Sequence, residues 1–434
     1  MQKERFKSIP VFDQIYEEVL SPFFDNLRDN RRNNQSYKLS DALRSGFAIY
    51  SLKCPSLFSF RKRSKAENSN LKSIFGIQSI PSDNGLRKIL DQVDPNLLRN
   101  GYQQLLQWVD QNKYLKDFRY WQNHLLVSLD GVEHFCSKQI NCAHCLSRKH
   151  RDGSQSYYHS MLSAAIVHPE QRQVLVVDNE PIVKQDGQQK NDCERNAAKR
   201  LLKSLQEHHA QQKMVLTMDA LYACAPIIKQ IQQNKKWRYI INVTDKGHSH
   251  LMDQFDQLDE LNKVNWKSYK AKDGEYIIAY MNDLSLNASH PELKTNLIYC
   301  IWKDNKGEEK IFSWVTNIRL TKGNVMKIMR MGRSRWKIEN EVFNTLKNQA
   351  YHFEHNFGHG QKHLCTNFAL LMMMAFCLDQ IQQHVCKIFQ TIWTDLKTRI
   401  KLWEAIRIVF KLIPVDNMKE IYLNIIDMYQ IRLE

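Results

Sequence analysis

Hydrophobic and polar positions divide the chain into a helical beginning, an alternating middle and a helical end. Apolar residues follow a helical spacing from residue 1 to about 120. Short apolar strands and helices then alternate, and a strand-like pattern continues from about residue 244 to 327. The sequence therefore predicts a helical N-terminal domain (1–120) and an α/β domain (121–360) with a β-rich insertion (about 244–327). A helical C-terminal region (361–434) follows.

Two helices in the N-terminal domain are predicted around a short break. The first covers residues 66–75, and Ser82 or Asp83 is expected to cap the second. Arg87 and Lys88 face away from the apolar stripe of the second helix. This arrangement is typical of a helix-turn-helix that reads DNA, and it also occurs in any small helical bundle.

The middle of the chain has a specific order of elements. Three strands, a helix, a strand, a helix and a strand are predicted, at residues 124–130, 161–168, 173–178, 192–205, 214–219, 220–233 and 237–243. This is the order of a ribonuclease H-like α/β fold.

Two of these strands end in an aspartate, Asp130 and Asp219. The carboxyl ends of strands are where α/β folds usually bind ligands. Taken alone, an aspartate after a strand is more often a helix or turn cap. A third acid lies in the segment 332–347, where Arg335 and Glu339 are four residues apart and share a helix face. An intrahelical ion pair is the alternative explanation for that pair.

Three converging carboxylates predict a divalent cation. At ~4 Å and an effective dielectric constant near 20, each ionised pair costs about 4 kcal/mol, which a cation removes. Carboxylate oxygens suit Mg²⁺ or Mn²⁺. Two such ions can activate a water or a 3′-hydroxyl and stabilise the leaving oxygen of a phosphodiester. Arg335 and Lys347 would then hold backbone phosphates beside the site.

Three segments resemble the acidic motifs of DDE-type transposases from bacterial insertion sequences: residues 129–131, 217–222 and 335–339. They are most similar to the group with a Tyr-Arg-Glu-Lys signature and a β insertion before the last acid. Residues 190–195 and 351–359 also resemble segments of related transposases. The resemblance spans about residues 125–359.

The resemblance implies roles for particular residues. Asp130, Asp219 and Glu339 become the catalytic acids that bind two Mg²⁺ or Mn²⁺ ions. Arg335 and Lys347 become the basic residues of the signature. The chain departs from the signature twice, because Gly332 stands where the signature has Tyr and because Lys347 falls eight rather than seven residues after Glu339. Glu341 therefore remains an alternative third acid.

The charge of the chain favours DNA as its partner. Lys and Arg total 62 against 46 acids, a formal charge of +16. Eleven of the basic residues, with three acids, fall in residues 27–74. A basic surface without a ligand is the alternative. The resemblance implies terminal inverted repeats and target DNA as substrates and a homodimer on paired ends, for which residues 368–376 are a candidate contact.

No apolar targeting segment follows Met1, and the longest apolar run, residues 368–378, is too short to span a bilayer. No membrane association is therefore expected. The protein is expected in the cytoplasm of a prokaryote, associated with the nucleoid.

Cysteines follow the first acid closely. Cys136, Cys142 and Cys145 lie near several histidines, and a Cys-x-x-Cys pair with Cys136 and one histidine could bind a structural Zn²⁺. Reduced cysteines in a polar hairpin are the alternative. His355, His359 and His363 also cluster, but Gly358 and Gly360 argue for a loop, and no ligand role is assigned to them.

The sequence therefore predicts a transposase that binds the ends of a mobile element and performs metal-dependent DNA cleavage and strand transfer. A ribonuclease H-like nuclease without strand transfer is one alternative. A catalytically inactive descendant that only binds DNA is the other.

Overall fold

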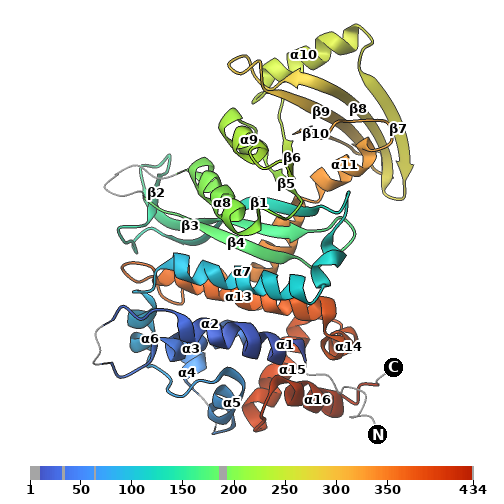
Figure 1. Cartoon of the computed structure of the whole chain (residues 1–434). Helices are drawn as coiled ribbons and strands as arrows, with labels where there is room; N and C mark the ends of the chain where they lie inside the picture. The colour runs from blue at the N-terminus through green and yellow to red at the C-terminus, as the bar shows by residue number, and fades with distance from the viewer. Residues whose placement is uncertain (1–9, 32–34, 63–64, 185–192, 433–434) are drawn as a thin grey trace.

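A ten-stranded mixed sheet runs through the computed structural model, which describes residues 10–31, 35–62, 65–184 and 193–432. Helical regions precede and follow the sheet in the chain (Figure 1). The strands are β1 (Leu125–Ser137), β2 (Leu146–Lys149), β3 (Gln155–Val167), β4 (Leu175–Ile182), β5 (Met214–Met218), β6 (Trp237–Asn242), β7 (Asn265–Ala271), β8 (Gly274–Ser285), β9 (Lys294–Lys303) and β10 (Glu309–Thr316). Their order is β2-β3-β1-β5-β6-β10-β9-β8-β7, and β4 pairs with β3.

The first half of this sheet is a ribonuclease H-like core. Strand β1 pairs antiparallel with β3 and parallel with β5, β6 extends the parallel part, and β4 lies antiparallel on β3. Helix α8 (Glu194–His209) connects β4 to β5, and the short η4 (Ala220–Tyr222) and α9 (Ala225–Gln232) connect β5 to β6. The predicted α/β fold class is confirmed. The predicted elements occur in the predicted order, with one additional strand, β2, between the first and the second of them.

The insertion continues the same sheet. Strand β10 pairs antiparallel with β6, Val315 opposite Ile241, so β7 to β10 extend the core sheet beyond β6. The segment also contains α10 (Ser249–Glu260), which the strand-like pattern did not predict. Leu251, Met252 and Phe255 form the buried side of α10. Helix α11 (Val325–Arg333) then leads back to the core.

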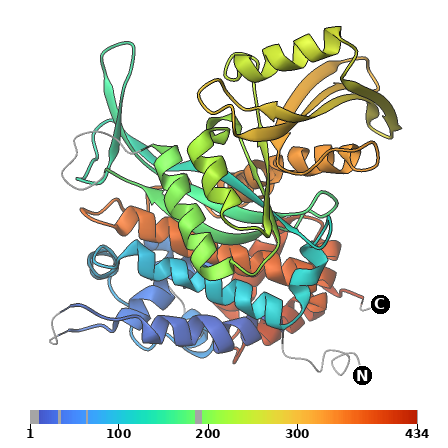
Figure 2. The ribbon, with the colours of Figure 1, turned by 45° about the horizontal axis from the view of Figure 1, so that its top comes forward.

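Helices cover both faces of the core sheet. Helix α8 packs against β3 and β4 on one face, and α7 (Pro95–Gln111) and α13 (Leu364–Val385) pack against β4 on the other (Figures 1 and 2). The remaining N-terminal helices lie beyond α7 and α13: α1 (Val11–Ile15), η2 (Tyr16–Leu20), α2 (Ser21–Asn26), α3 (Leu39–Ser51), α4 (Leu57–Arg61), α5 (Lys65–Phe75) and α6 (Asp83–Leu90). The short η3 (Tyr114–Phe118) joins α7 to β1.

The N-terminal and C-terminal helices form one body. Beside the N-terminal helices lie α14 (Lys387–Leu396), α15 (Arg399–Leu412) and α16 (Met418–Tyr429) (Figure 1). Asn70 Nδ2 of α5 donates to the carbonyl of Phe410 on α15 at 2.8 Å. Lys53 Nζ lies 2.7 Å from Asp379 Oδ2 of α13, and both side chains are buried. Residues more than 300 positions apart therefore share one core.

The two helices predicted in the N-terminal region are confirmed as α5 and α6. Ser82 caps α6, because its hydroxyl accepts a hydrogen bond from the Gly85 N–H at 3.2 Å. Arg87 of α6 points into the protein, where its Nε donates to the carbonyl of Phe357 at 3.2 Å. The expectation that Arg87 faces outward is therefore wrong. Lys88 is exposed.

Part of the N-terminal basic stretch has structural roles. Arg44 and Lys53 are buried and paired with Asp25 and Asp379, so they are not on a DNA-facing surface. Arg32 and Arg63 lie outside the described residues.

The longest apolar segment is buried within the protomer. Helix α13 is long and apolar enough to cross a membrane, but its whole apolar window is buried inside the protein. Residues 368–376 pack among α3, α7 and the sheet, so they are covered by this chain itself. The expectation that they form a dimer contact is wrong, because a second copy cannot reach them.

Candidate active site

Parallel pairing of β1 and β5 places Asp130 and Asp219 side by side. The register runs from Leu125 opposite Met214 to Ser128 opposite Thr217. Each aspartate follows the last of these paired residues by two positions. Because the strands are parallel and in register, both carboxylates lie at the same level of neighbouring strands. Asp219 directly follows the end of β5, whereas Asp130 lies within β1, which continues to Ser137, so the expectation that the first strand ends at Asp130 is wrong.

The two aspartates also have local hydrogen bonds. Asp130 Oδ1 accepts from the N–H of Gly131 at 3.0 Å. Asp219 caps η4 and accepts from the N–H of Leu221 at 2.9 Å. The cap explains part of the position of Asp219. In both aspartates the local hydrogen bond uses Oδ1, and Oδ2 takes no part in it.

Arg335 joins the first acid to the third. Its side chain is buried, with one guanidinium nitrogen 3.0 Å from Asp130 Oδ2 and another 2.9 Å from Glu339 Oε1. Glu339 belongs to a π-helical turn, η5 (Ile338–Phe343), that joins α11 to α12 (Asn344–Asn348). The intrahelical pair expected from the sequence is therefore part of a bridge that reaches 205 residues back along the chain.

Burial and neighbouring negative charge raise the pKa values of the two aspartates. Burial raises the pKa of Asp130 to about 7; Arg335 opposes this rise, and Glu339 and Asp219 add to it. Burial likewise raises the pKa of Asp219. Desolvation and like charges both disfavour ionised carboxylates, and a nearby cation favours them. The Arg335 guanidinium is the positive charge that this structure places among them.

A fourth acid, Glu194, lies next to this group. Its Oε2 accepts from the Tyr222 hydroxyl at 3.1 Å, and burial raises its pKa. A Cβ added at Gly131 would meet Glu194 Oε1 at 2.7 Å, so the backbone beside Asp130 packs directly on this carboxylate. The segment 190–195 was singled out only by resemblance, and residues 190–192 lie outside the described residues. No role was assigned to Glu194, because only the tertiary structure brings it to the first acid.

The flanking positions of the third acid differ in what they contact. Burial lowers the pKa of Lys337, and the nearby Glu341 opposes this shift, whereas Glu339 interacts with Asp130 and Arg335. Lys347 of α12 pairs with Glu354 at 2.9 Å.

Gly332 has a structural explanation. A Cβ at this position would lie 2.8 Å from Trp314 Nε1 and 3.1 Å from Ile240. Helix α11 therefore approaches the junction of β6 and β10 too closely for any side chain. The tyrosine of the signature cannot be accommodated here.

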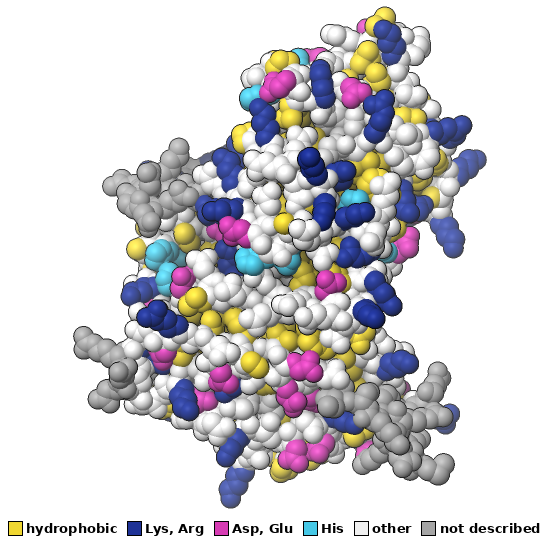
Figure 3. All heavy atoms as spheres, viewed as in Figure 1, with side chains coloured by type: hydrophobic (Ala, Val, Ile, Leu, Met, Phe, Trp, Pro, Cys, Tyr) yellow, Lys and Arg dark blue, Asp and Glu magenta, His cyan; other side chains and the backbone are white. Residues whose placement is uncertain are grey.

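A cleft of about 780 Å³ lies beside the third-acid segment. Its lining includes Ser334, Trp336 and Asn340, which neighbour Arg335 and Glu339 in sequence. Aromatic and basic side chains dominate the rest: Tyr276, Trp302, Lys310, Phe312, Trp314, Arg330, Arg333 and Lys337. Lys and Arg side chains also spread over the core helices and the insertion on the face in Figure 3. The cleft therefore combines basic and aromatic side chains beside the third-acid segment.

The cysteines and histidines come together in a set that differs from the expected one. Cys142 and Cys145 lie with His159 and His359, and their ligand atoms are all within 4.8 Å of one another. Cys136 is exposed and is not in this group.

Comparison with known proteins agrees with this geometry. A family model described as "Transposase DDE domain" matches residues 141–378, more than half of the 434-residue chain. The match includes Asp219 and Glu339 and begins eleven residues after Asp130. A search of curated proteins found no match. The family match, the ribonuclease H-like core and the acids gathered on it lead to one conclusion: this chain belongs to the transposase DDE domain family.

Proposed function

We propose that the protein is a cut-and-paste transposase, with Asp130, Asp219 and Glu339 as its catalytic acids. The observation that carries the proposal is the bridge from Asp130 through Arg335 to Glu339, with Asp219 beside Asp130 in the strand register. It joins two neighbouring strands to a helix far away in sequence. Local capping and intrahelical pairing do not require such convergence.

The donor set fits divalent metal ions. Three carboxylates offer hard oxygen ligands, and their negative charge exceeds that of the single guanidinium among them. Asp130, Asp219 and Glu339 would hold two Mg²⁺ or Mn²⁺ ions. When bound, these ions supply an activated water or 3′-hydroxyl and stabilise the leaving oxygen of the phosphodiester.

The basic residues position the DNA strand in this proposal. The Arg335 guanidinium is buried beside the acids, and its fork geometry matches a phosphate as well as a carboxylate. Lys347 is held by Glu354 in a surface pair, which contributes little and exchanges readily for a phosphate. Glu339 rather than Glu341 is the third acid, because Glu339 faces the other two.

The substrates proposed are the terminal inverted repeats of the element and its target DNA. The net charge of +16 supports a polyanionic partner. The N-terminal region, residues 1–120, would recognise the repeats, and residues 121–360 would cut and join them. A homodimer would hold two ends together, through a surface other than residues 368–376. The site of action would be the nucleoid in the prokaryotic cytoplasm.

The test uses labelled duplexes that carry the element's own ends, taken from the DNA flanking the gene, with Mg²⁺, Mn²⁺ or EDTA. Metal-dependent cleavage at the boundary, followed by joining of the cut end to a second duplex, is the expected result. Cleavage without joining would support a ribonuclease H-like nuclease instead. Binding of the ends without cleavage would support an inactive descendant and would overturn the proposal.

A further inference from the structure

We propose that Cys142, Cys145, His159 and His359 bind one structural Zn²⁺ ion. The four residues lie apart from the acids and are not used in the proposed cleavage. Cys145, His159 and His359 are buried, and Cys142 is half-buried. Two thiols and two imidazoles form a soft donor set that suits Zn²⁺ rather than Mg²⁺.

The distances match a tetrahedral site. With Zn–S of ~2.3 Å and Zn–N of ~2.0–2.1 Å, tetrahedral ligands lie about 3.8 Å apart for two sulfurs, about 3.5 Å for sulfur and nitrogen and about 3.3 Å for two nitrogens. The two sulfurs, of Cys142 and Cys145, are 3.8 Å apart. His159 Nε2 lies 3.5 Å and 3.4 Å from these sulfurs. His359 Nε2 lies 3.2 Å from Cys145 Sγ and 3.2 Å from His159 Nε2.

The surroundings orient the donor atoms toward a common centre. The Nδ1–H of His359 donates to the carbonyl of Gly360 at 2.8 Å, which leaves the lone pair of Nε2 facing the cluster. This is the outer hydrogen bond that metal-bound histidines usually make. The N–H of Cys142 donates to Cys145 Sγ at 3.4 Å, as a thiolate ligand favours. Phe135 packs against the His359 ring, with the two ring centroids 4.5 Å apart.

Packing without a metal explains this arrangement less well. Without a metal, the Nε2 atoms of His159 and His359, 3.2 Å apart, can share only one proton. The Nδ1 atom of His359 already carries the proton of that ring, which it donates to the Gly360 carbonyl. The two sulfurs, one buried and one half-buried, would then have only weak partners. A Zn²⁺ ion satisfies all four donor atoms and displaces the two thiol protons to solvent.

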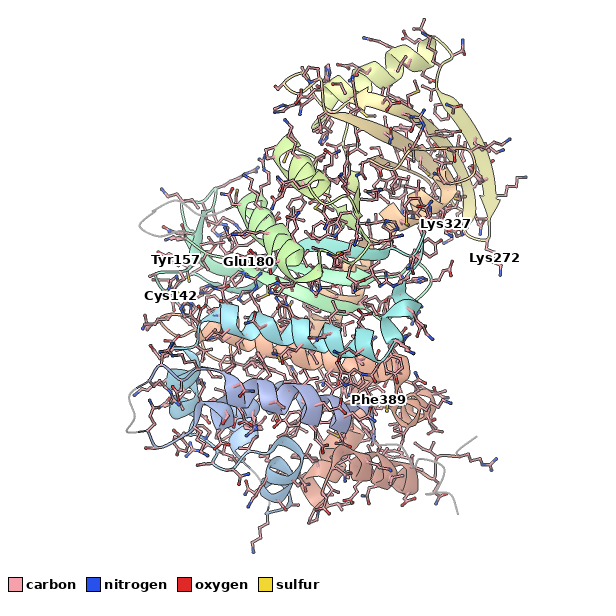
Figure 4. All side chains as sticks on the ribbon, viewed as in Figure 1. Cys142, Tyr157, Glu180, Lys272, Lys327 and Phe389 are labelled. Carbon is pink, nitrogen blue, oxygen red and sulfur yellow. The ribbon has the colours of Figure 1, made fainter. Side chains whose placement is uncertain are left out.

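The site would join distant parts of the chain. Cys142 and Cys145 precede β2, His159 lies on β3, and His359 follows α12, 214 residues after Cys145. Figure 4 places Cys142 at the end of the sheet that carries β2, next to the helical layer. A metal ion here would link the loop that follows α12 to β3, which pairs with the strand of Asp130, and to the segment before β2. Its role is thus to hold the core, and it is independent of the ions proposed at the acids.

The experiment measures zinc per chain in the full-length protein, purified under reducing conditions and dialysed against metal-free buffer. Wild type is expected to retain one equivalent, and Cys142→Ser and His359→Ala are expected to lose it. Cys136→Ser is the matched control, because this exposed cysteine lies outside the group, and it should retain the metal. Asp219→Ala should also retain it, which separates this proposal from the proposed active site.

Cobalt substitution and thermal unfolding give further readouts. Co²⁺ in the wild type should show the sulfur-to-metal charge transfer and the intense visible absorption of a tetrahedral thiolate site, and Cys142→Ser should lack both. A strong chelator should lower the Tm of the wild type and leave that of folded Cys142→Ser unchanged. The proposal is overturned if folded, reduced wild type keeps no metal after incubation with zinc. It is equally overturned if Cys142→Ser and His359→Ala, folded by circular dichroism, keep a full equivalent.

Discussion

The Ser128 hydroxyl lies 2.7 Å from the Thr217 hydroxyl, and both side chains are buried between β1 and β5. The two residues are directly opposite each other in the parallel register, two positions before Asp130 and Asp219. A buried polar pair at this place ties the strands together where the acids must align. A shift in the pairing of these strands would separate the hydroxyls and the carboxylates together.

Thr217→Val should therefore destabilise the protein by about 1–3 kcal/mol, because it leaves the buried Ser128 hydroxyl without its partner. Adding Ser128→Ala to this variant should recover part of the loss. Urea unfolding of the single and double variants measures both effects in a double-mutant cycle. Strictly additive losses would show that the hydroxyl pair does not contribute as a unit.

Gly332→Ala should destabilise the protein by about 1–3 kcal/mol, the usual cost of overpacking a core. The new Cβ would lie 2.8 Å from Trp314 Nε1. Gly323→Ala is the matched control, because its Cβ would meet only Thr321 Oγ1 at 3.9 Å. A difference in Tm between the two variants is expected, and equal Tm values would contradict the close packing of α11.

Arg335→Gln should lower stability in EDTA by roughly 1–3 kcal/mol. This is less than the cost of breaking a fully buried pair, because the Glu339 side chain is 43% exposed. Mg²⁺ should then raise the Tm of the variant more than that of the wild type, since the carboxylates have lost their guanidinium. Arg319→Gln, which removes an exposed partner of Asp283, should show neither effect. An unchanged Tm of Arg335→Gln in EDTA would contradict the bridge.

Asp13 should make stability depend on pH. Its oxygens accept from the N–H groups of Met418 and Lys419 at 2.9 Å and 3.1 Å, and burial raises its pKa from 3.8 to about 6. The folded state thus keeps a proton that the unfolded state releases, so this group's contribution weakens as pH rises from about 4 to about 6 and is constant above. At 1.36 kcal/mol per pKa unit, the change is about 3 kcal/mol.

Asp13→Asn should lack this dependence. Measured by urea unfolding, the stability of the variant relative to wild type should increase between about pH 4 and pH 7. Asparagine keeps only one of the two acceptor oxygens of Asp13, and this loss lowers the stability by the same amount at every pH. The informative quantity is therefore the slope of the stability difference against pH. Parallel stability curves for the two proteins would contradict the raised pKa.

The core of the fold could be predicted because its signals are local. Short apolar runs define β5 to within one residue and locate the start of β1, whereas β1 continues seven residues beyond the predicted end at Asp130. Helix α10 is missed because the strand-like pattern of the segment that follows is extended across it, although Leu251, Met252 and Phe255 lie at helical spacing. The packing of α13 against α3 and α7 could not be predicted, because a fully apolar segment fits an internal core and a dimer interface equally well.

The candidate site was predictable where a motif carried it. Asp130, Asp219, Arg335 and Glu339 stand in recognisable segments, and the structure brings them together. Glu194 and His359 were not assigned, since each meets its partners only through tertiary contacts with residues far away in sequence. Cys136 was grouped with the other cysteines by spacing alone, and spacing does not show that its side chain is exposed.

Single-turnover cleavage of element-end DNA by acid variants tests the central claim most directly. The comparison includes wild type, Asp130→Ala, Asp219→Ala, Glu339→Ala and Glu341→Ala, each with Mg²⁺ and each checked for end binding. The account predicts that the first three variants bind the ends but cut no faster than wild type in EDTA, while Glu341→Ala cuts at a rate close to that of wild type. Metal-dependent cleavage by Glu339→Ala at the same boundary would contradict it, because the third carboxylate would then lie elsewhere.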